Sequence, residues 1–157
     1  MDVLAYILLF IVDVMKAFIS VKTGYIYCGA AGAMTAFACV VLGHCFPVFF
    51  GFKGGKGVAA AFGAALALNW MSACLALLVA GLLFLVTRRM SVASIVAVLT
   101  YPVLIWFFDA RYVYFAVAAA AFLVIMHAAN IKRIAKGEEK PLTIGGRHNS
   151  EDEEQKK

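Results

Sequence analysis

A basic, glycine-rich stretch, GHCFPVFFGFKGGKGV at residues 43–58, interrupts this otherwise apolar chain. Its glycines can adopt backbone angles that other residues avoid, and they let a ligand approach the main chain closely. Its lysines add positive point charges, and a helix predicted to begin at Val58 would present unpaired N–H groups and the positive end of its dipole. These features together predict a phosphate-binding loop, formed by Lys53, Gly54, Gly55, Lys56 and Gly57.

Other interpretations of this stretch stay open. It is not a Walker A loop, because Gly57 stands where a serine or threonine would hold magnesium. A flexible basic loop that only marks the cytoplasmic side of a membrane would show the same composition. His44 ends the preceding apolar run, where it could contribute to a phosphate site or bond a backbone carbonyl at the membrane interface.

Two further polar pairs lie at the ends of apolar runs, each with i, i+3 spacing that places both members on one helix face. His127 and Asn130 could serve catalysis or only cap the end of a helix. Ser91 and Ser94 could contact a substrate or only smooth the packing of membrane helices. We therefore treat all four residues as candidates for the same site as the glycine loop.

Asp13 and Lys16 lie inside the first apolar run. Charges within a membrane are costly and often mark functional sites. At i, i+3 spacing the two side chains can also neutralise each other, and this pairing is the interpretation that we favour.

The composition predicts an all-α, polytopic integral membrane protein. The chain has 157 residues, of which 64% are hydrophobic and only 15% charged, so it is more apolar than an ordinary soluble domain. We attribute its net charge of +5 to membrane topology and expect no nucleic-acid partner. Its four cysteines form no CxxC motif, so we expect no disulfide framework, no metal site and no cofactor.

Six apolar spans are predicted, because crossing a membrane takes about 20 apolar residues. The run from residue 58 to residue 87 is too long for one ordinary helix, and we divide it at Asn69 into a short helix and a full one. Residues 22–27 are predicted to form a loop. The spans are residues 3–21, 28–42, 58–68, 70–87, 91–108 and 112–128.

Lysine and arginine residues are concentrated after the second, fourth and sixth spans, which places both termini in the cytoplasm. The glycine loop, the serine pair and the His127–Asn130 pair then emerge on one face of the membrane. We predict a transmembrane domain of residues 1–130 and a polar cytoplasmic tail of residues 131–157 that is partly disordered.

Four motifs in this chain resemble those of the bacterial acyl-phosphate:glycerol-3-phosphate acyltransferases, the PlsY family. GHCFPVFFGFKGGKGVA resembles the family signature GHxxPxFxxFKGGKGVAT, and TRRMSVASI resembles TRxxSxxSI. HAANIKRIAKGEEK resembles HxxNIxRLxxGxEx, and DVMKAF resembles DxxKG. The motifs occur in the family's order, and the resemblance extends to about Lys140.

The resemblance implies a multi-pass enzyme of the bacterial cytoplasmic membrane with its active site facing the cytoplasm. Such an enzyme transfers an acyl group from an acyl phosphate to the 1-hydroxyl of glycerol 3-phosphate, among membrane lipids. The products are lysophosphatidic acid, used in phospholipid synthesis, and phosphate. The resemblance assigns phosphate binding to the glycine loop, with Ser91 and Ser94, activity to His127 and Asn130, and a structural role to Glu139. Because an acyl phosphate is already activated, the site mainly has to orient its substrates and stabilise developing charge.

Family members also begin with a further span and a loop that resembles GSGNPGATN, and neither precedes Asp13 in these 157 residues. The resemblance therefore implies a truncated version of a seven-helix fold. Ala60 stands in place of the usual threonine of GVAT, and Ala17 in place of the usual glycine after Lys16. Two alternatives remain, which are an inactive membrane relative that keeps the phosphate pocket and a small anion transporter.

Overall fold

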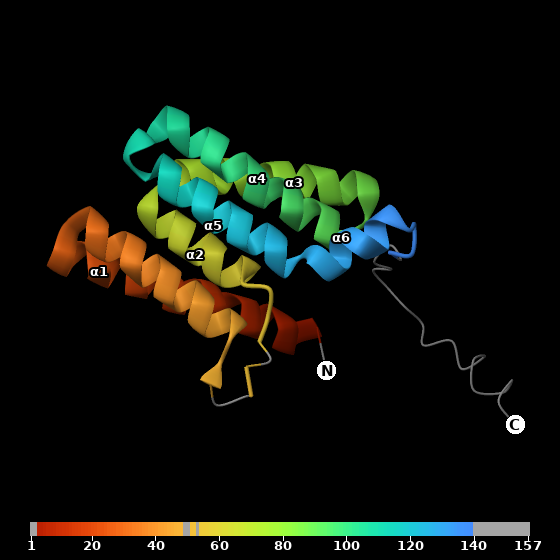
Figure 1. The fold of residues 1–157 in the computed structure, drawn as a ribbon, viewed down its shortest axis with the longest axis horizontal. Helices are drawn as coiled ribbons and strands as arrows, with labels where there is room; N and C mark the ends of the chain where they lie inside the picture. Colours follow the sequence, from red (N-terminus) through yellow and green to blue (C-terminus); the bar gives the residue numbers. More distant parts are fainter. Residues whose placement is uncertain (1–2, 49–50, 53, 140–157) are drawn as a thin grey trace, which may run out of the picture.

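The computed structural model describes residues 3–48, 51–52 and 54–139, and the regular elements in these ranges are all helices (Figure 1). The prediction of an all-helical membrane protein is confirmed. The predicted disorder of the tail falls on residues outside the described ranges from Lys140 onward, and so does the predicted phosphate ligand Lys53. The helices are α1 (Val3–Cys45), α2 (Val58–Leu68), α3 (Trp70–Thr87), α4 (Met90–Phe108), the short 3-10 helix η2 (Ala110–Tyr112), α5 (Val113–Met126) and α6 (Ala128–Ala135).

Helix α1 is a hairpin of two antiparallel arms (Figure 1). The chain reverses at Cys28, with φ −135°, and Gly29, with φ 58°, a left-handed angle that glycine adopts at little cost. Near the turn the backbones of Gly24 and Gly32 touch, because a Cβ atom on either residue would overlap the other's carbonyl group. The predicted loop at residues 22–27 is therefore wrong: these residues stay helical, and the positive-φ glycine places the turn just after them.

The predicted division at Asn69 is confirmed. Asn69 leaves the helical conformation, and its side chain caps α3 by accepting a hydrogen bond of 2.9 Å from the Ser72 amide. At about 1.5 Å per residue, α2 is only about 16 Å long, roughly half of the 30 Å hydrocarbon core of a bilayer. Helix α2 is therefore too short to cross a membrane alone.

Length and hydropathy identify three helices in the described part that could cross a membrane, namely α1, α3 and α4. A fourth is added if the bent pair of residues 110–126 and 128–135 counts as one span. Because α1 folds back at Gly29, its two arms correspond to two of the predicted apolar spans.

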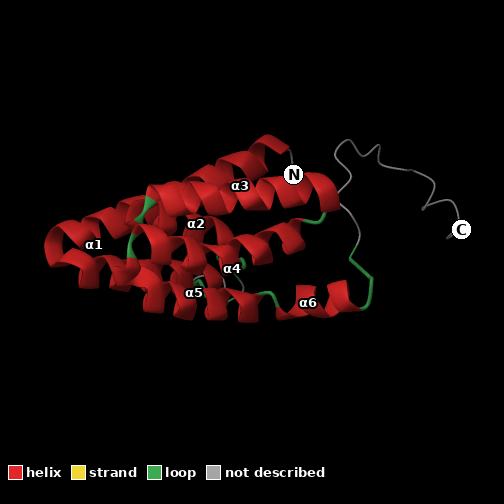
Figure 2. Cartoon of the chain, turned by 90° about the horizontal axis from the view of Figure 1, so that it is seen from above, coloured by secondary structure: helices red, strands yellow, loops and turns green. Residues whose placement is uncertain are grey.

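The helices lie side by side in an elongated bundle (Figures 1 and 2). Helix α1 packs on α2, α3 on α4, and α4 on α5. One end of the bundle carries the reversal of α1, the connection between α2 and α3, and the connection between α4 and α5 (Figure 1). The other end carries the glycine loop, the connection between α3 and α4, and α6, as the sequence predicts for these three segments.

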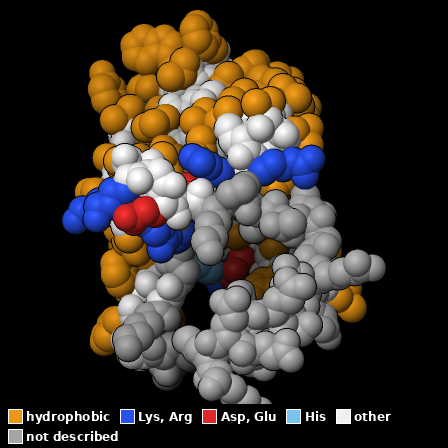
Figure 3. All heavy atoms as spheres, turned by 90° about the vertical axis from the view of Figure 1, so that its right-hand side faces the viewer, with side chains coloured by type: hydrophobic (Ala, Val, Ile, Leu, Met, Phe, Trp, Pro, Cys, Tyr) orange, Lys and Arg blue, Asp and Glu red, His pale blue; other side chains and the backbone are white. Residues whose placement is uncertain are grey.

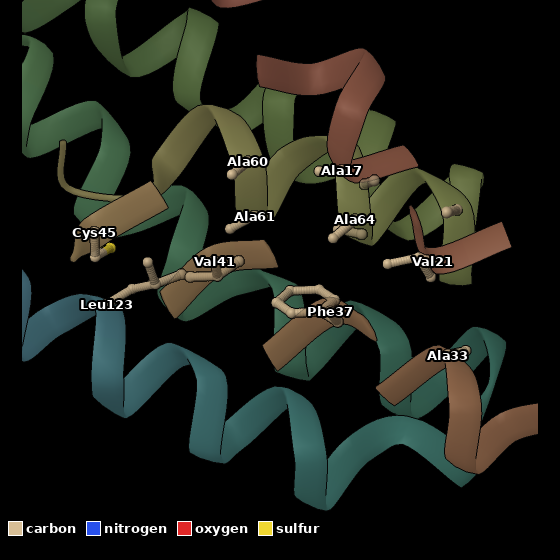
Figure 4. Close-up of a cluster of buried hydrophobic side chains, with 13 residues drawn as sticks. Ala17, Val21, Ala33, Phe37, Val41, Cys45, Ala60, Ala61, Ala64 and Leu123 are labelled. Atoms are coloured by element: carbon tan, nitrogen blue, oxygen red, sulfur yellow. The ribbon is translucent and has the colours of Figure 1, made fainter. Parts of the chain in front are cut away.

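Small side chains dominate the larger core cluster, which lies between α1, α2 and α5 (Figure 4). Ala17 and Ala33 of α1 are fully buried, as are Ala60 and Ala64 of α2. Many large apolar residues face outward instead, where lipid solvates them, and Val86 is 83% exposed. The helices approach closely because alanine and glycine line their contacts.

Gly63 is the closest approach of α2 to α1, and we expect the substitution Gly63→Ala to lower the melting temperature. A Cβ atom at Gly63 would overlap the backbone of Val14, so the helices would have to separate, at a cost of about 1–3 kcal/mol. The matched control is Gly81→Ala in α3, whose added Cβ atom meets no atom within 4 Å. Equal melting temperatures for the two variants in thermal denaturation would contradict this packing argument.

Candidate functional site

The end of the bundle that carries the glycine loop is strongly basic (Figure 3). The loops and α6 supply most of these charges. The opposite end has Lys22, near the turn of α1, and Arg111, whose guanidinium pairs with Asp109 at 2.8 Å. This asymmetry agrees with the positive residues expected on the cytoplasmic side of a membrane protein. The described basic residues at the glycine-loop end include Lys16, Lys56, Arg88, Arg89, Lys132, Arg133 and Lys136.

The glycine loop packs tightly against the last turn of α1. A Cβ atom at Gly54 would overlap the main-chain carbonyls of His44 and Cys45, and one at Gly55 would overlap the His44 ring. Gly57 begins α2 with φ 80°, and a Cβ atom there would lie 2.8 Å from Cys45 Sγ. The N-cap residue Gly57 has no side chain to cap α2, so the first N–H groups of this helix are available to an anion in the loop.

Charged residues of the C-terminal segment act on Lys56 of the glycine loop. Partial burial lowers the pKa of the Lys56 ammonium, the positive charge of Arg133 lowers it further, and Glu139 opposes both effects. The Oε2 atom of Glu139 is itself buried. A bound anion would relieve the repulsion between Lys56 and Arg133, so this geometry favours anion binding.

His127 lies at the 62° bend between α5 and α6 and is only 1% exposed. Its Nδ1 atom is 2.8 Å from the carbonyl oxygen of Leu123. Because a carbonyl can only accept a hydrogen bond, Nδ1 carries the proton, and Nε2 of the neutral ring keeps its lone pair. Leu123 also packs near the glycine loop, since its Cδ2 atom would lie 3.2 Å from a Cβ atom at Gly57.

Asn130 joins the C-terminal segment to the start of α4. It is 3% exposed, and its side-chain amide donates a hydrogen bond to Ser91 Oγ. The structure thus brings together two of the predicted site residues that lie 39 positions apart in the chain. Ser94 does not join this pair but lines the cavity described below.

His44 belongs to a charged cluster with Asp13 and Lys16. Asp13 Oδ1 lies 2.5 Å from Lys16 Nζ and 3.2 Å from His44 Nδ1. The predicted pairing of Asp13 with Lys16 is confirmed, and the imidazole bonds this pair rather than a backbone carbonyl. The cluster fixes the ring that supports Gly55, a link that sequence reasoning missed because Asp13 and His44 lie 31 positions apart.

An apolar cavity of about 280 Å³ begins beside the glycine loop. It lies between α2, α3, α4 and α5, with Phe10 and Phe37 of α1 on one side. Val58 and Ser94 lie near its basic end, and Tyr101 lies at its other end. Alanine is the commonest lining residue and comes from α2, α3, α4 and α5. Sequence reasoning missed this cavity, although alanines that recur at helical spacing in these segments were its signal.

A family model described as glycerol-3-phosphate acyltransferase matches residues 1–137. A glycerol-3-phosphate acyltransferase of Shewanella halifaxensis is 45% identical over 114 residues, which cover 73% of this chain and 56% of that protein. The enzyme of the same name from Actinobacillus succinogenes is 35% identical over 139 residues, or 86% of this chain and 68% of that protein. The chain therefore spans between about half and two thirds of the length of these relatives.

Two crystal structures of PlsY, an integral membrane glycerol 3-phosphate acyltransferase, share the fold with a TM-score of 0.83 and 33% sequence identity. The lysophosphatidic acid form matches over 87% of this chain and 72% of its own, and the glycerol 3-phosphate form over 87% and 70%. Likeness in sequence and in fold thus points to one family, and the chain belongs to the glycerol-3-phosphate acyltransferase family.

Proposed function

We propose that this protein transfers a fatty acyl group from an acyl phosphate to glycerol 3-phosphate, forming lysophosphatidic acid and phosphate. The observation that carries the proposal is the apolar cavity that begins beside a basic glycine loop, because both substrates carry phosphate and the donor also carries an acyl tail. The two PlsY structures are a glycerol 3-phosphate form and a lysophosphatidic acid form, the acceptor and the product of this reaction.

The phosphate subsite in this proposal is the glycine loop at the start of α2. Gly54, Gly55 and Gly57 leave room for an anion to reach the main-chain N–H groups, and Lys56 supplies charge. Lys53 is assigned to the same role by its place in the motif. His44 supports the loop from α1, and Ser91 and Ser94 line the neighbouring start of α4.

The acyl subsite is the cavity. Along α4 it runs from Met90 to Tyr101, which at a rise of about 1.5 Å per residue is roughly 16 Å. One leaflet of a bilayer has a hydrocarbon depth of about 15 Å, half of the full core. The cavity therefore has the length of a lipid acyl chain, and its exposed lining residues Leu77 and Gly81 leave it open to lipid on the α3 side.

The reaction forms a bond between the glycerol 1-oxygen and the acyl carbon and breaks the bond from that carbon to the phosphate oxygen. We assign acceptance of the hydroxyl proton to Nε2 of His127, since Nδ1 is committed to the Leu123 carbonyl. Asn130, held by Ser91, would orient the reacting groups with its second N–H donor and its carbonyl oxygen, which the bond to Ser91 leaves free. Glu139 would keep a structural role beside Lys56.

We place the site on the cytoplasmic face of the bacterial cytoplasmic membrane. Support comes from the basic residues of the glycine loop, the α3–α4 connection and α6 at one end of the bundle. Glycerol 3-phosphate and the released phosphate are water-soluble, so a site at this boundary can exchange them with the aqueous phase while the acyl chain stays in the membrane.

The direct test is product formation by the purified full chain in lipid nanodiscs. We expect lysophosphatidic acid from radiolabelled glycerol 3-phosphate and palmitoyl phosphate. For Lys56→Ala we expect the KM for glycerol 3-phosphate to rise roughly tenfold or more, because a charge-assisted bond of about 1.5–3 kcal/mol is lost. The matched control, Lys136→Ala, removes an exposed lysine at the end of α6 and should leave KM near the wild-type value.

Absence of product would overturn the proposed activity. A thermal melt separates the alternatives in that case. If glycerol 3-phosphate raises the melting temperature of the wild type but not of Lys56→Ala, the chain binds phosphate without transferring an acyl group. No stabilisation of the wild type would argue against the phosphate subsite as well.

A further inference from the structure

We propose that Tyr101 closes the deep end of the acyl cavity and thereby sets the length of acyl chain that the protein prefers. This inference rests on the proposed function and names a specificity-determining residue for it. It follows from the positions of the residues that line the cavity, from what lies beneath its floor, and from the cost of forcing extra methylene groups into packed side chains.

The lining residues identify the floor. On α4 the cavity is lined from Met90 to Tyr101 and not beyond. The last lining residue of α2 and the first ones of α3 and α5 mark the same level, and these are Ala65, Ala73 and Ala116. Tyr101 is thus the large side chain that α4 places at this end of the cavity, and Phe37 of α1, whose ring packs edge-on against Phe115, lines the wall near the same level.

The space beneath Tyr101 is filled. Ile105, Tyr112 and Val113 form a second buried cluster, on which Tyr101 packs. Ile105 has no exposed surface. An acyl chain that stays within the cavity therefore cannot extend past the tyrosine ring unless it displaces well-packed side chains, which protein interiors resist. Carbons that leave through the opening on the α3 side lie in lipid and gain no contact with the cavity.

We attribute the floor to the tyrosine ring and not to its hydroxyl group. Tyr101 Oη is buried, and no group in the described part of the chain bonds it. Removing this oxygen leaves the ring and its contacts with the second cluster in place. Tyr101→Phe should therefore keep the length preference, whereas Tyr101→Ala should extend the cavity by the volume of the ring.

Forcing extra methylene groups into the packed side chains beneath the floor lowers affinity by roughly tenfold, the lower range of overpacking costs. The substrate series is a set of saturated acyl phosphates that differ by two carbons. For Tyr101→Ala, we expect kcat/KM for a chain two carbons longer than the wild-type optimum to rise roughly tenfold relative to the optimum chain. The lipid-facing control Tyr114→Ala removes a tyrosine that is 85% exposed on α5 and should keep the wild-type profile.

A second variant tests whether a shorter cavity shifts the preference toward shorter acyl chains. Ala97 lines the cavity one helical turn nearer the glycine loop, so Ala97→Phe should shorten the cavity and shift the preference to shorter chains. It also tests the proposal if Tyr101→Ala does not fold. An unchanged chain-length profile in whichever of these two variants folds would overturn the proposal.

The test of chain-length preference can fail while the proposed acyl transfer is supported, and the reverse also holds. If the wild type transfers acyl groups and the variants keep its chain-length preference, Tyr101 does not set the chain length, but the proposed activity is supported. If the wild type transfers nothing, chain-length preference can be measured by binding instead. Alkylphosphonates of increasing length, which cannot be transferred, are added to each variant, and the rise in melting temperature shows which length binds best. The expected result is again a longer optimum for Tyr101→Ala, and identical optima in all variants would overturn the proposal.

Discussion

Replacing His127 with glutamine should lower kcat for acyl transfer by roughly 100-fold or more, the effect typical of losing a general base. Glutamine has no nitrogen that accepts a proton, and its amide lies near the position of Nε2, so the bond of 2.8 Å from Nδ1 to the Leu123 carbonyl is lost as well. We expect KM for glycerol 3-phosphate to change little, because the glycine loop is untouched. Initial rates at saturating palmitoyl phosphate measure both constants.

The melting temperature of His127→Gln provides the control, because His127 also lies at the bend between α5 and α6. A normal melting temperature with a low kcat supports the proton-acceptor role. A wild-type kcat would show that the imidazole takes no part in proton transfer. A variant that loses kcat only in proportion to its folded fraction would assign His127 a structural role instead.

The second large effect is expected for Gly55→Ala, which should raise KM for glycerol 3-phosphate by roughly tenfold to 100-fold. The added Cβ atom would overlap the His44 ring, and that ring cannot simply turn away because Asp13 and Lys16 hold it. The loop must therefore move off α1, at a cost of about 1–3 kcal/mol typical of overpacking. Because the loop carries the N–H groups and Lys56, its displacement weakens phosphate binding directly.

Gly43→Ala is the matched control for this experiment. It makes the same substitution in the same stretch, but its Cβ atom meets nothing within 4 Å, and alanine is favoured over glycine in a helix by about 1 kcal/mol. We expect an unchanged KM and an equal or higher melting temperature. Equal KM values for the Gly55 and Gly43 variants would show that the contact with His44 does not position the loop.

The two ends of the proposed site differ in their contacts. The cluster of Asp13, Lys16 and His44 holds the phosphate loop against α1, whereas the lining of the proposed acyl cavity contains many alanines. Small side chains there leave room for a flexible tail, while the loop fixes the head group. Positioning of the reacting ends supplies much of the catalysis when the donor is already activated.

Local chemistry made several elements predictable from the sequence. Asn69 breaks the long run because its side chain caps α3, and the loop before α2 follows from glycines and lysines that no membrane span would carry. Counting positive residues placed the glycine loop, Ser91 and His127 at one end of the bundle, since charges avoid the hydrocarbon core whatever the packing. These features depend on a few neighbouring residues, so the sequence contains them directly.

The tertiary structure decided the contacts that make a site. The sequence by itself determined the helices and the face on which the polar residues emerge. It did not determine that α1 turns at Gly29, that Asp13 reaches His44, or that Asn130 bonds Ser91. The physical reason is that nearly every residue of a membrane helix is apolar, so hydropathy does not distinguish a side chain that faces lipid from one that faces another helix. Close packing at alanines and glycines decides which side chains face another helix and which face lipid. The cavity beneath the glycine loop exists only once the helices are packed.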